Sequence, residues 1–288
     1  MHWTERRQKY RAVLAGSRCL HPGSVFDPLS ARIAAEVGYE IGLFAGSTAS
    51  LTVLGAPDIV VLTLSEFAEQ AYRINRAGTL PLMVDADHGY GNALNVMRTV
   101  EELETAGVAG LTIEDTALPA AYGDGGKTRL ISREEGVGKM RAALAARQDP
   151  SLVIIARTSA MNLTGTEDAV ARIKAYEAAG VDAIFLAGIK TQAQIDAAAA
   201  AVKLPLILGN VASSLVDLEA LARRGIRICL QGHAPFMAAV QAIYATMTAL
   251  HAGTPPEKLT ALAPPELMKR LTRAADYQRW TKEFLGGG

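Results

Sequence analysis

Short apolar runs that alternate with helical segments constrain the fold of this chain more than any other feature. Each run is rich in β-branched residues or leucine, ends in a turn signal and precedes an alanine-rich stretch with apolar residues at helical spacing. The pattern predicts strands over 24–26, 41–45, 81–85, 110–114, 152–157, 183–187, 204–208 and 226–230. No proline- or serine-rich linker separates these units, so we expect one continuous α/β domain.

The number of units points to a closed barrel. Eight βα units in 288 residues favour a (β/α)8 TIM barrel, a fold that typically takes ~250 residues. Several helical stretches end in a glycine just before the next strand, as in YEAAGVDAIFLAG, where the glycine supplies the left-handed cap that ends a helix. The alternative is a doubly wound open sheet, which would normally carry a glycine-rich phosphate-binding turn after its first strand. No such turn is present.

Two further helices are predicted after the eighth strand, over 234–250 and 264–284, and the connection between them contains Thr254-Pro255-Pro256. We therefore expect a single barrel domain over 1–288, with residues 254–288 as a C-terminal helical extension. An amphipathic helix that is surplus to a barrel must bury its apolar face elsewhere, and a contact with another subunit would provide this.

Composition excludes several classes of protein. Lys and Arg number 29 and Asp and Glu number 29, so the formal net charge is zero and a nucleic-acid partner is not expected. The apolar runs stop well short of the ~18 residues that a membrane span needs. Two cysteines, Cys19 and Cys229, cannot form a disulfide framework or a zinc site, and the charged N-terminus does not resemble a secretory signal. These features predict a cytoplasmic location.

Acidic residues gather where two predicted strands end, which is where a barrel carries its catalytic groups. The third strand ends in DADHGYGN, which places Asp85 and Asp87 on the same side of an extended segment, and the fourth ends in LTIEDT, which adds Glu114 and Asp115. Carboxylates at one barrel mouth suit a hard cation, Mg²⁺ or Mn²⁺, because no His or Cys cluster is available for zinc. The alternative for each acid is a helix cap or an acceptor of loop hydrogen bonds.

Other polar residues follow the remaining strands. Arg157, at the end of the fifth strand, could hold a substrate carboxylate or could form a structural ion pair. Gly46, Ser47 and Thr48, after the second strand, could offer backbone N–H groups and a hydroxyl to an anion. Asp58 is either a further acid of the site or a turn residue. A cation beside an arginine and an anion-binding turn would suit a small 2-oxo acid, chelated through its carboxylate and carbonyl oxygens.

Taken together, DADHGYGN, LTIEDT, ART and the GSTAS turn resemble the isocitrate lyase and phosphoenolpyruvate mutase superfamily. The resemblance covers nearly the whole chain. It is closest to the oxaloacetate decarboxylase branch, through VFDPLSARIA, DADHGYGNALNVMRTVEELE, EEGVGKMRAAL and QGHAPFMAA.

The resemblance implies roles for individual residues. Asp85 would correspond to the aspartate that binds the metal directly, and Asp87, Glu114 and Asp58 would hold metal-bound water molecules. Mg²⁺ is the expected cofactor, with Mn²⁺ as the alternative.

The resemblance also implies a substrate-binding set. Ser47, the amides of Gly46 and Thr48, and Arg157 would bind the substrate carboxylate. His233, in the QGHA turn after the eighth strand, would reach the substrate. Without the resemblance, a histidine at this place would be read as a residue that begins a helix.

The activity implied is Mg²⁺-dependent decarboxylation of oxaloacetate to pyruvate and CO₂ through an enolate, by a homotetramer whose last helix is exchanged between subunits. Three enzyme alternatives stay open: another carbon–carbon lyase, a carbon–phosphorus lyase or mutase of the superfamily, and a Schiff-base aldolase. Against the first two, the loop over 117–132 carries no catalytic cysteine, and its Lys127 has no accompanying asparagine. Against the third, Lys190 lies well beyond the sixth strand. A catalytically silent anion-binding barrel is the alternative from another class.

Overall fold

The structure is a computed structural model and describes residues 3–123, 125–209 and 211–286. Its strands are β1 (Gly23–Ser24), β2 (Gly42–Phe44), β3 (Leu82–Asp85), β4 (Gly110–Glu114), β5 (Val153–Thr158), β6 (Ala183–Ala187), β7 (Leu206–Gly209) and β8 (Ile226–Cys229). The α-helices before β8 are α1 (Trp3–Ala15), α2 (Pro28–Val37), α3 (Gly46–Ala49), α4 (Leu64–Ala77), α5 (Ala93–Thr105), α6 (Arg133–Ala146), α7 (Ala160–Leu163), α8 (Thr166–Ala179), α9 (Gln192–Ala201) and α10 (Leu218–Arg223). After β8 come α11 (Ala234–His251), α12 (Pro265–Leu271) and α13 (Ala274–Leu285). Three short helices of other types complete the set: η1 (Ser50–Leu54), η2 (Ser213–Leu215) and η3 (Pro256–Lys258).

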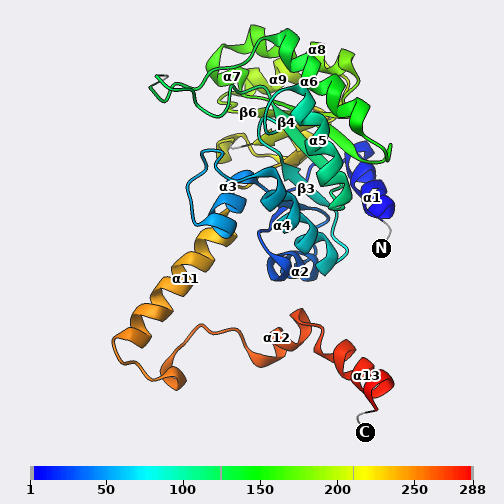
Figure 1. Cartoon of the computed structure of the whole chain (residues 1–288). Helices are drawn as coiled ribbons and strands as arrows, with labels where there is room; N and C mark the ends of the chain where they lie inside the picture. Colours follow the sequence, from blue (N-terminus) through cyan, green and yellow to red (C-terminus); the bar gives the residue numbers. More distant parts are fainter. Residues whose placement is uncertain (1–2, 124, 210, 287–288) are drawn as a thin grey trace. The chain divides into compact units, whose positions relative to one another are not determined.

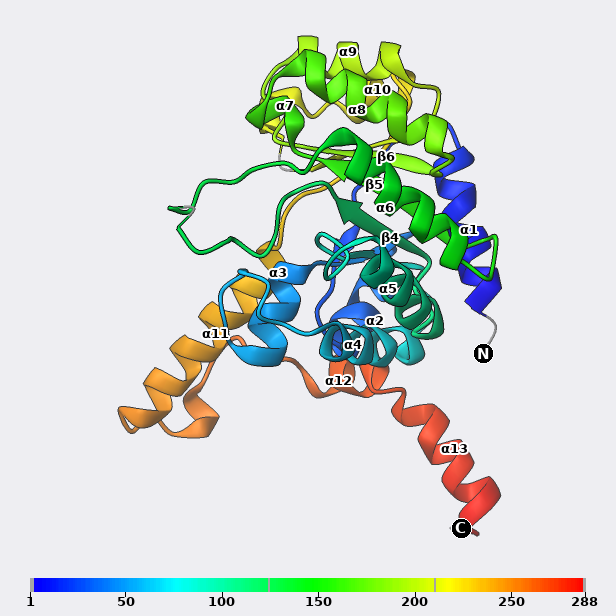
Figure 2. The ribbon, with the colours of Figure 1, turned by 45° about the horizontal axis from the view of Figure 1, so that its top comes forward.

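The eight strands form one parallel sheet in the order β1 to β8. A parallel bridge between Leu20 and Ile228 joins the segment before β1 to β8, so this segment links the two edges of the sheet. Figure 1 shows the helices between the strands on the outside of the sheet, and Figure 2 shows the same layers from a second direction. The predicted (β/α)8 fold is confirmed, and every predicted strand lies within two residues of an observed one.

Side chains of alternate strand residues pack into two separate apolar cores, as the period-two geometry of a strand requires. One core fills the interior of the sheet and includes Leu43, Met83, Ile155 and Ile207. The other lies between the sheet and the surrounding helices. Because apolar side chains fill the interior, a substrate-binding site in this barrel is expected at one of its two ends.

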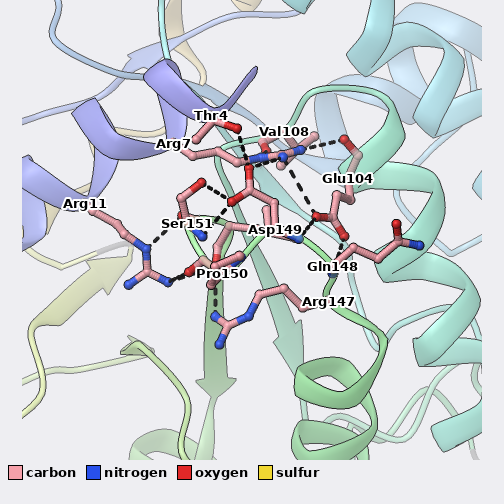
Figure 3. A network of polar contacts seen from close by, with 11 residues as sticks. Thr4, Arg7, Arg11, Glu104, Val108, Arg147, Gln148, Asp149, Pro150 and Ser151 are labelled. Carbon is pink, nitrogen blue, oxygen red and sulfur yellow. Dashed lines mark hydrogen bonds and ion pairs between the residues drawn. The ribbon is translucent and has the colours of Figure 1, made fainter. Parts of the chain in front are cut away.

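Helix α1 covers the end of the barrel at which the strands begin. Tyr10 is fully buried in the interior core, and a Cβ added to Gly110, the first residue of β4, would lie 2.7 Å from its ring. Arg7 holds the helix in place, since its Nε donates to the Val108 carbonyl oxygen at 3.0 Å and its Nη1 donates to Asp149 Oδ2 at 2.7 Å (Figure 3). With this end covered, the opposite end, where the strands finish, is left for the site.

Residues 234–288 form a compact unit of their own, separate from the unit of residues 1–233. The helix predicted over 264–284 is wrong in one respect, because it is divided into α12 and α13. Arg273 adopts a left-handed conformation (φ +59°) at the break, and its Nε donates to Asp276 Oδ2 at 2.8 Å in the first turn of α13. The assignment of 254–288 as the extension stays a prediction. None of the described helices is long and apolar enough to cross a membrane.

Candidate active site

An arginine and two carboxylates meet where β3, β4 and β5 end. Asp85 and Glu114 are the last residues of β3 and β4, and the register pairs Glu114 with Arg157 of β5. Arg157 Nη1 contacts Asp85 Oδ2, and Arg157 Nε lies 3.2 Å from Glu114 Oε2. Burial would lower the pKa of Arg157, but the Asp85 and Glu114 carboxylates outweigh this and raise it. The ion pair that the sequence left open for Arg157 is therefore present, while a role in binding substrate stays a prediction.

The Asp85 carboxylate is oriented by its neighbours as well as by Arg157. Thr112 Oγ1, on the adjacent strand β4, donates to Asp85 Oδ1 at 3.0 Å, and the Asp87 amide lies 3.3 Å from the same oxygen. Asp87 itself has φ +48°, a left-handed turn conformation that aspartate adopts more readily than most residues, and this sets the direction of its side chain. The two aspartates of the DAD motif, which are separated by Ala86, are thus held beside each other.

Gly46 allows the Asp87 carboxylate to occupy its position. A Cβ on Gly46 would lie 2.8 Å from Asp87 Oδ1 and 2.9 Å from Oδ2, closer than real Cβ atoms approach such oxygens. Burial raises the pKa of Asp87 well above its usual range, and the Asp85, Asp58 and Glu114 carboxylates raise it further. Carboxyl groups are therefore crowded at this point, and the ionised form of Asp87 is disfavoured unless a cation lies nearby.

The remaining predicted acids lie close enough to take part. Burial raises the pKa of Glu114, although Arg157 opposes the shift. Asp58 lies in an exposed loop but is still partly shielded from water, and this shielding together with the nearby Asp85 carboxylate raises its pKa. If all four carboxyl groups are ionised beside one arginine, negative charge is in excess, and a bound cation would favour this ionised state.

The carboxylates do not by themselves enclose an ion. Over the ranges that the structure describes, no three His, Cys, Asp or Glu side chains are grouped so that they could hold a metal ion. Magnesium often keeps several water ligands and binds through one or two carboxylates, so one direct ligand with the other acids on bound water fits this arrangement. The donor set is all oxygen, as Mg²⁺ and Mn²⁺ require.

Asp115 does not join this cluster, contrary to the reading of four carboxylates converging at the mouth. Its Oδ2 accepts from Tyr176 OH at 2.7 Å and from Arg172 Nη1 at 3.1 Å, both on α8. Asp115 immediately follows Glu114, and successive residues of an extended segment face opposite sides, so one acid points to the mouth and the next to the outer helices.

The turn predicted to bind an anion forms the short helix α3. Gly46 and Thr48 are buried, and Ser47 is half-buried. Thr48 Oγ1 donates to the Ala45 carbonyl oxygen at 3.0 Å, so this hydroxyl is used within the turn. The first N–H groups of a helix lack intrahelical acceptors, which leaves the backbone of α3 suited to an anion. Gly46 places this turn next to Asp87.

His233 lies half-buried after β8, and its Nδ1 is 2.9 Å from Ser24 Oγ. Burial lowers its pKa, although the Asp85 and Asp58 carboxylates act in the opposite direction. Ser24 was not predicted from the sequence as a residue of the site. Neither was Phe185, whose ring centroid lies 5.3 Å from the Arg157 guanidinium carbon. Strand alternation would have placed both side chains inside the barrel.

Comparison with known proteins agrees with this geometry. The family described as phosphoenolpyruvate phosphomutase matches residues 11–251. The chain belongs to this family. Oxaloacetate decarboxylase from Rhodopseudomonas palustris strain BisB18 is 56% identical over 286 residues, with 99% of each chain covered. The oxaloacetate decarboxylase of Bradyrhizobium diazoefficiens is 55% identical over the same length, again with 99% of each chain covered. The chain is therefore an enzyme of the carboxy-lyase class, as its sequence predicted.

Solved structures of this phosphomutase family and its relatives share the fold. An oxaloacetate acetylhydrolase in complex with the inhibitor 3,3-difluorooxalacetate has a TM-score of 0.86 and 30% identity, covering 99% of this chain and 98% of that one. A phosphonopyruvate hydrolase in complex with oxalate and Mg²⁺ has a TM-score of 0.84 and 29% identity, covering 97% of this chain and 99% of that one. These relatives therefore bind small dicarboxylates or their analogues.

Proposed function

We propose that this enzyme decarboxylates oxaloacetate to pyruvate and CO₂ with the help of Mg²⁺. The identity of 56% to an oxaloacetate decarboxylase along 99% of the chain is the observation that carries the proposal. The cluster of Asp85, Asp87, Glu114 and Arg157 at the strand ends supplies the groups that this chemistry needs.

Asp85 would hold the metal directly, and Asp87, Glu114 and Asp58 would hold its bound water molecules. A bound Mg²⁺ would act as a Lewis acid that polarises the substrate carbonyl and stabilises negative charge on its oxygen. Arg157 is already poised among these carboxylates, which fixes the position of its guanidinium.

The other residues would orient the substrate. Arg157 and the α3 turn, through Ser47 and the amides of Gly46 and Thr48, would bind the C1 carboxylate of oxaloacetate. His233 would donate a hydrogen bond to the C2 carbonyl oxygen or to the departing C4 carboxylate. This contact would favour the conformation in which the C3–C4 bond can break.

The reaction itself breaks one carbon–carbon bond. The C3–C4 bond cleaves, C4 leaves as CO₂, and its electron pair remains on C3 and is delocalised onto the C2 oxygen as the enolate of pyruvate. A proton from water or from a loop residue is then added at C3 to give pyruvate. Electrostatic stabilisation of the negative charge that develops on the enolate oxygen would contribute most of the rate acceleration.

A carbon–carbon or carbon–phosphorus lyase or mutase of the same superfamily is the second candidate, since solved relatives include a 2,3-dimethylmalate lyase and a phosphonopyruvate hydrolase. A reaction that takes its proton from a thiol is disfavoured. Cys19 and Cys229 are buried, and burial raises the pKa of their thiols to about 12 and about 11. Neither lies in the loop over 117–132.

The proposed assembly is a homotetramer with exchanged C-terminal helices. One face of α11 exposes Met237, Val240, Tyr244 and Met247, each more than two-fifths exposed. Within the barrel unit, a cavity of about 580 Å³ is lined by Cys19, Leu218 and Ala222 among others, beside β8. An apolar helix from a second copy would fill such a gap in the outer layer. A cytoplasmic location also stays a prediction.

The test is an assay of purified protein with oxaloacetate, 2-methylisocitrate, phosphonopyruvate and 2,3-dimethylmalate, with products detected directly. We expect pyruvate and CO₂ from oxaloacetate above its spontaneous rate, loss of this activity with EDTA and recovery with added Mg²⁺. Turnover of another substrate alone would favour the second candidate, and a lack of turnover with every substrate in the presence of Mg²⁺ would favour a silent anion-binding barrel.

A further inference from the structure

Ser24 occupies a fixed place inside the barrel. The Gly23 amide donates to the Ile41 carbonyl oxygen at 3.0 Å, and the Val25 amide donates to the Leu43 carbonyl oxygen at 2.9 Å, so the backbone on both sides of Ser24 is held by the β2 segment. A Cβ on Gly23 would meet Ala34 and Tyr39 at 3.0 Å, which places position 23 against the outer helix layer. Because successive side chains of a strand alternate, Ser24 faces the interior.

His233 reaches the same point from the other end of the chain. It follows β8, and the segment before β1 is bridged to β8 through Leu20 and Ile228. The Ser24 hydroxyl and His233 Nδ1 lie 2.9 Å apart, at normal hydrogen-bond distance. A hydrogen bond between β1 and the turn after β8 therefore fixes one nitrogen of this imidazole.

The surroundings of His233 favour one direction of this hydrogen bond. His233 lies near the Asp85 and Asp58 carboxyl groups, and the proposed substrate is a dianion. An imidazole beside carboxylate oxygens interacts favourably with them when it donates a hydrogen bond. In the neutral ring only one nitrogen carries a proton, so Nε2 can donate only if Nδ1 is an acceptor. A serine hydroxyl can supply the proton that Nδ1 then accepts.

We propose that Ser24 is a positioning residue that donates its hydroxyl proton to His233 Nδ1, so that the neutral ring carries its proton on Nε2 and offers it to a substrate oxygen. The catalytic part of this inference rests on the proposed function, because the oxygen that receives the Nε2 proton belongs to oxaloacetate. The tautomer is a property of the free protein and can be measured without any substrate.

The first experiment measures the tautomer by NMR in uniformly ¹⁵N-labelled protein, through long-range couplings between ring protons and ring nitrogens. The His233 signals are assigned with a His233→Gln variant. We expect a pure Nε2–H pattern in the wild type and in Ser24→Thr, which keeps the hydroxyl. In Ser24→Ala we expect mixed tautomers. A wild-type ring protonated on Nδ1, or a Ser24→Ala ring identical to the wild type, would overturn the proposal.

The second experiment is a double-mutant cycle on decarboxylation. Loss of one hydrogen bond predicts a fall in kcat of roughly 2- to 10-fold in Ser24→Ala, with a much smaller change in KM and with recovery in Ser24→Thr. In a His233→Gln background, Ser24→Ala should have no further effect, because its role acts through the ring. Independent, multiplicative losses would contradict positioning.

The two readouts separate this inference from the proposed function. If the wild type has the Nε2–H tautomer and loses it in Ser24→Ala but does not decarboxylate oxaloacetate, the proposed reaction is wrong and the positioning of His233 stands. If the wild type decarboxylates oxaloacetate but the His233 tautomer is the same in Ser24→Ala, the proposed role of Ser24 is wrong and the proposed reaction stands.

Discussion

The Asp87 carboxylate occupies the space that a side chain at Gly46 would fill, since a Cβ at position 46 would lie 2.8 Å from Asp87 Oδ1. This relationship couples the turn after β2, predicted to bind the substrate carboxylate, to the acids after β3, predicted to bind the metal. A change at one position must therefore displace the other.

Gly46→Ala should reduce kcat/KM for oxaloacetate by about 10- to 100-fold and weaken activation by Mg²⁺, because Asp87 must move away from its place. Gly138→Ala is the matched control, since a Cβ there meets nothing within 4 Å. A Mg²⁺ titration of activity checks both variants. Wild-type kinetics in Gly46→Ala would mean that neither catalysis nor activation by Mg²⁺ depends on the position of the Asp87 carboxylate.

Asp85→Ala should lower Mg²⁺-dependent pyruvate release by roughly 10²- to 10³-fold or more, because it removes the proposed direct ligand. The fold should remain, as judged by circular dichroism, since Arg157 keeps Glu114 as an ion-pair partner. Asp196→Ala, which removes a surface partner of Arg224, serves as the control. Retained turnover would rule out the ligand role of Asp85.

His233→Gln should slow decarboxylation by about 10²-fold while changing the affinity for oxalate much less, because the contact is made to the reacting part of the substrate. The comparison uses steady-state rates and inhibition by oxalate. His251→Gln, at the end of α11, should behave as the wild type. An unchanged rate would return His233 to the role of a residue that only begins a helix.

Asp149 should make the stability of the protein depend on pH. Burial alone would raise its pKa, but hydrogen bonds from Ser151, Arg7 and Thr4 prevail and lower it far below the ordinary value of 3.8. The unfolded chain therefore takes up a proton on Asp149 before the folded chain does, and the stabilisation present above pH 3.8 is lost as the pH falls further.

The free energy of unfolding, measured with urea at several pH values, tests this. The difference between the wild type and Asp149→Asn should be constant near neutral pH and should shrink below the pH at which free aspartate is protonated. Arg7→Met should destabilise by about 1.5–3 kcal/mol near neutrality, since it removes the charge-assisted hydrogen bond between Arg7 and the half-buried Asp149. A difference that does not vary with pH would contradict the shifted pKa.

Deletion of the residues after Pro264 should dissociate the proposed tetramer, because it removes α12 and α13 from the extension. Light scattering after size-exclusion chromatography gives the mass directly. An unchanged mass would count against exchange of this segment. Replacement of the exposed Met237 and Tyr244 by serine would then test whether the apolar face of α11 forms the contact between subunits.

Much of the fold could be predicted from local pattern. Strand runs with period two and glycines after helices are set by neighbouring residues, so all eight strands and the parallel βα order could be predicted. The division of the last helix at Arg273 could not, because a left-handed residue there leaves no clear signature in sequence.

Some features of the candidate site could likewise be predicted from the sequence, and others could not. That Asp85 and Glu114 would lie together follows from their places at the ends of adjacent strands. That Arg157 pairs with both, that Asp115 turns outward to Arg172, and that Ser24 meets His233 depended on side-chain directions.

The sequence by itself determined the barrel, its strand ends and the residue types gathered at them, because these depend on periodicity and on the regular geometry of parallel strands. Only the tertiary structure decided which atoms touch. Contacts such as that between Ser24 and His233, 209 positions apart, arise from closure of the whole sheet, and no local pattern records them.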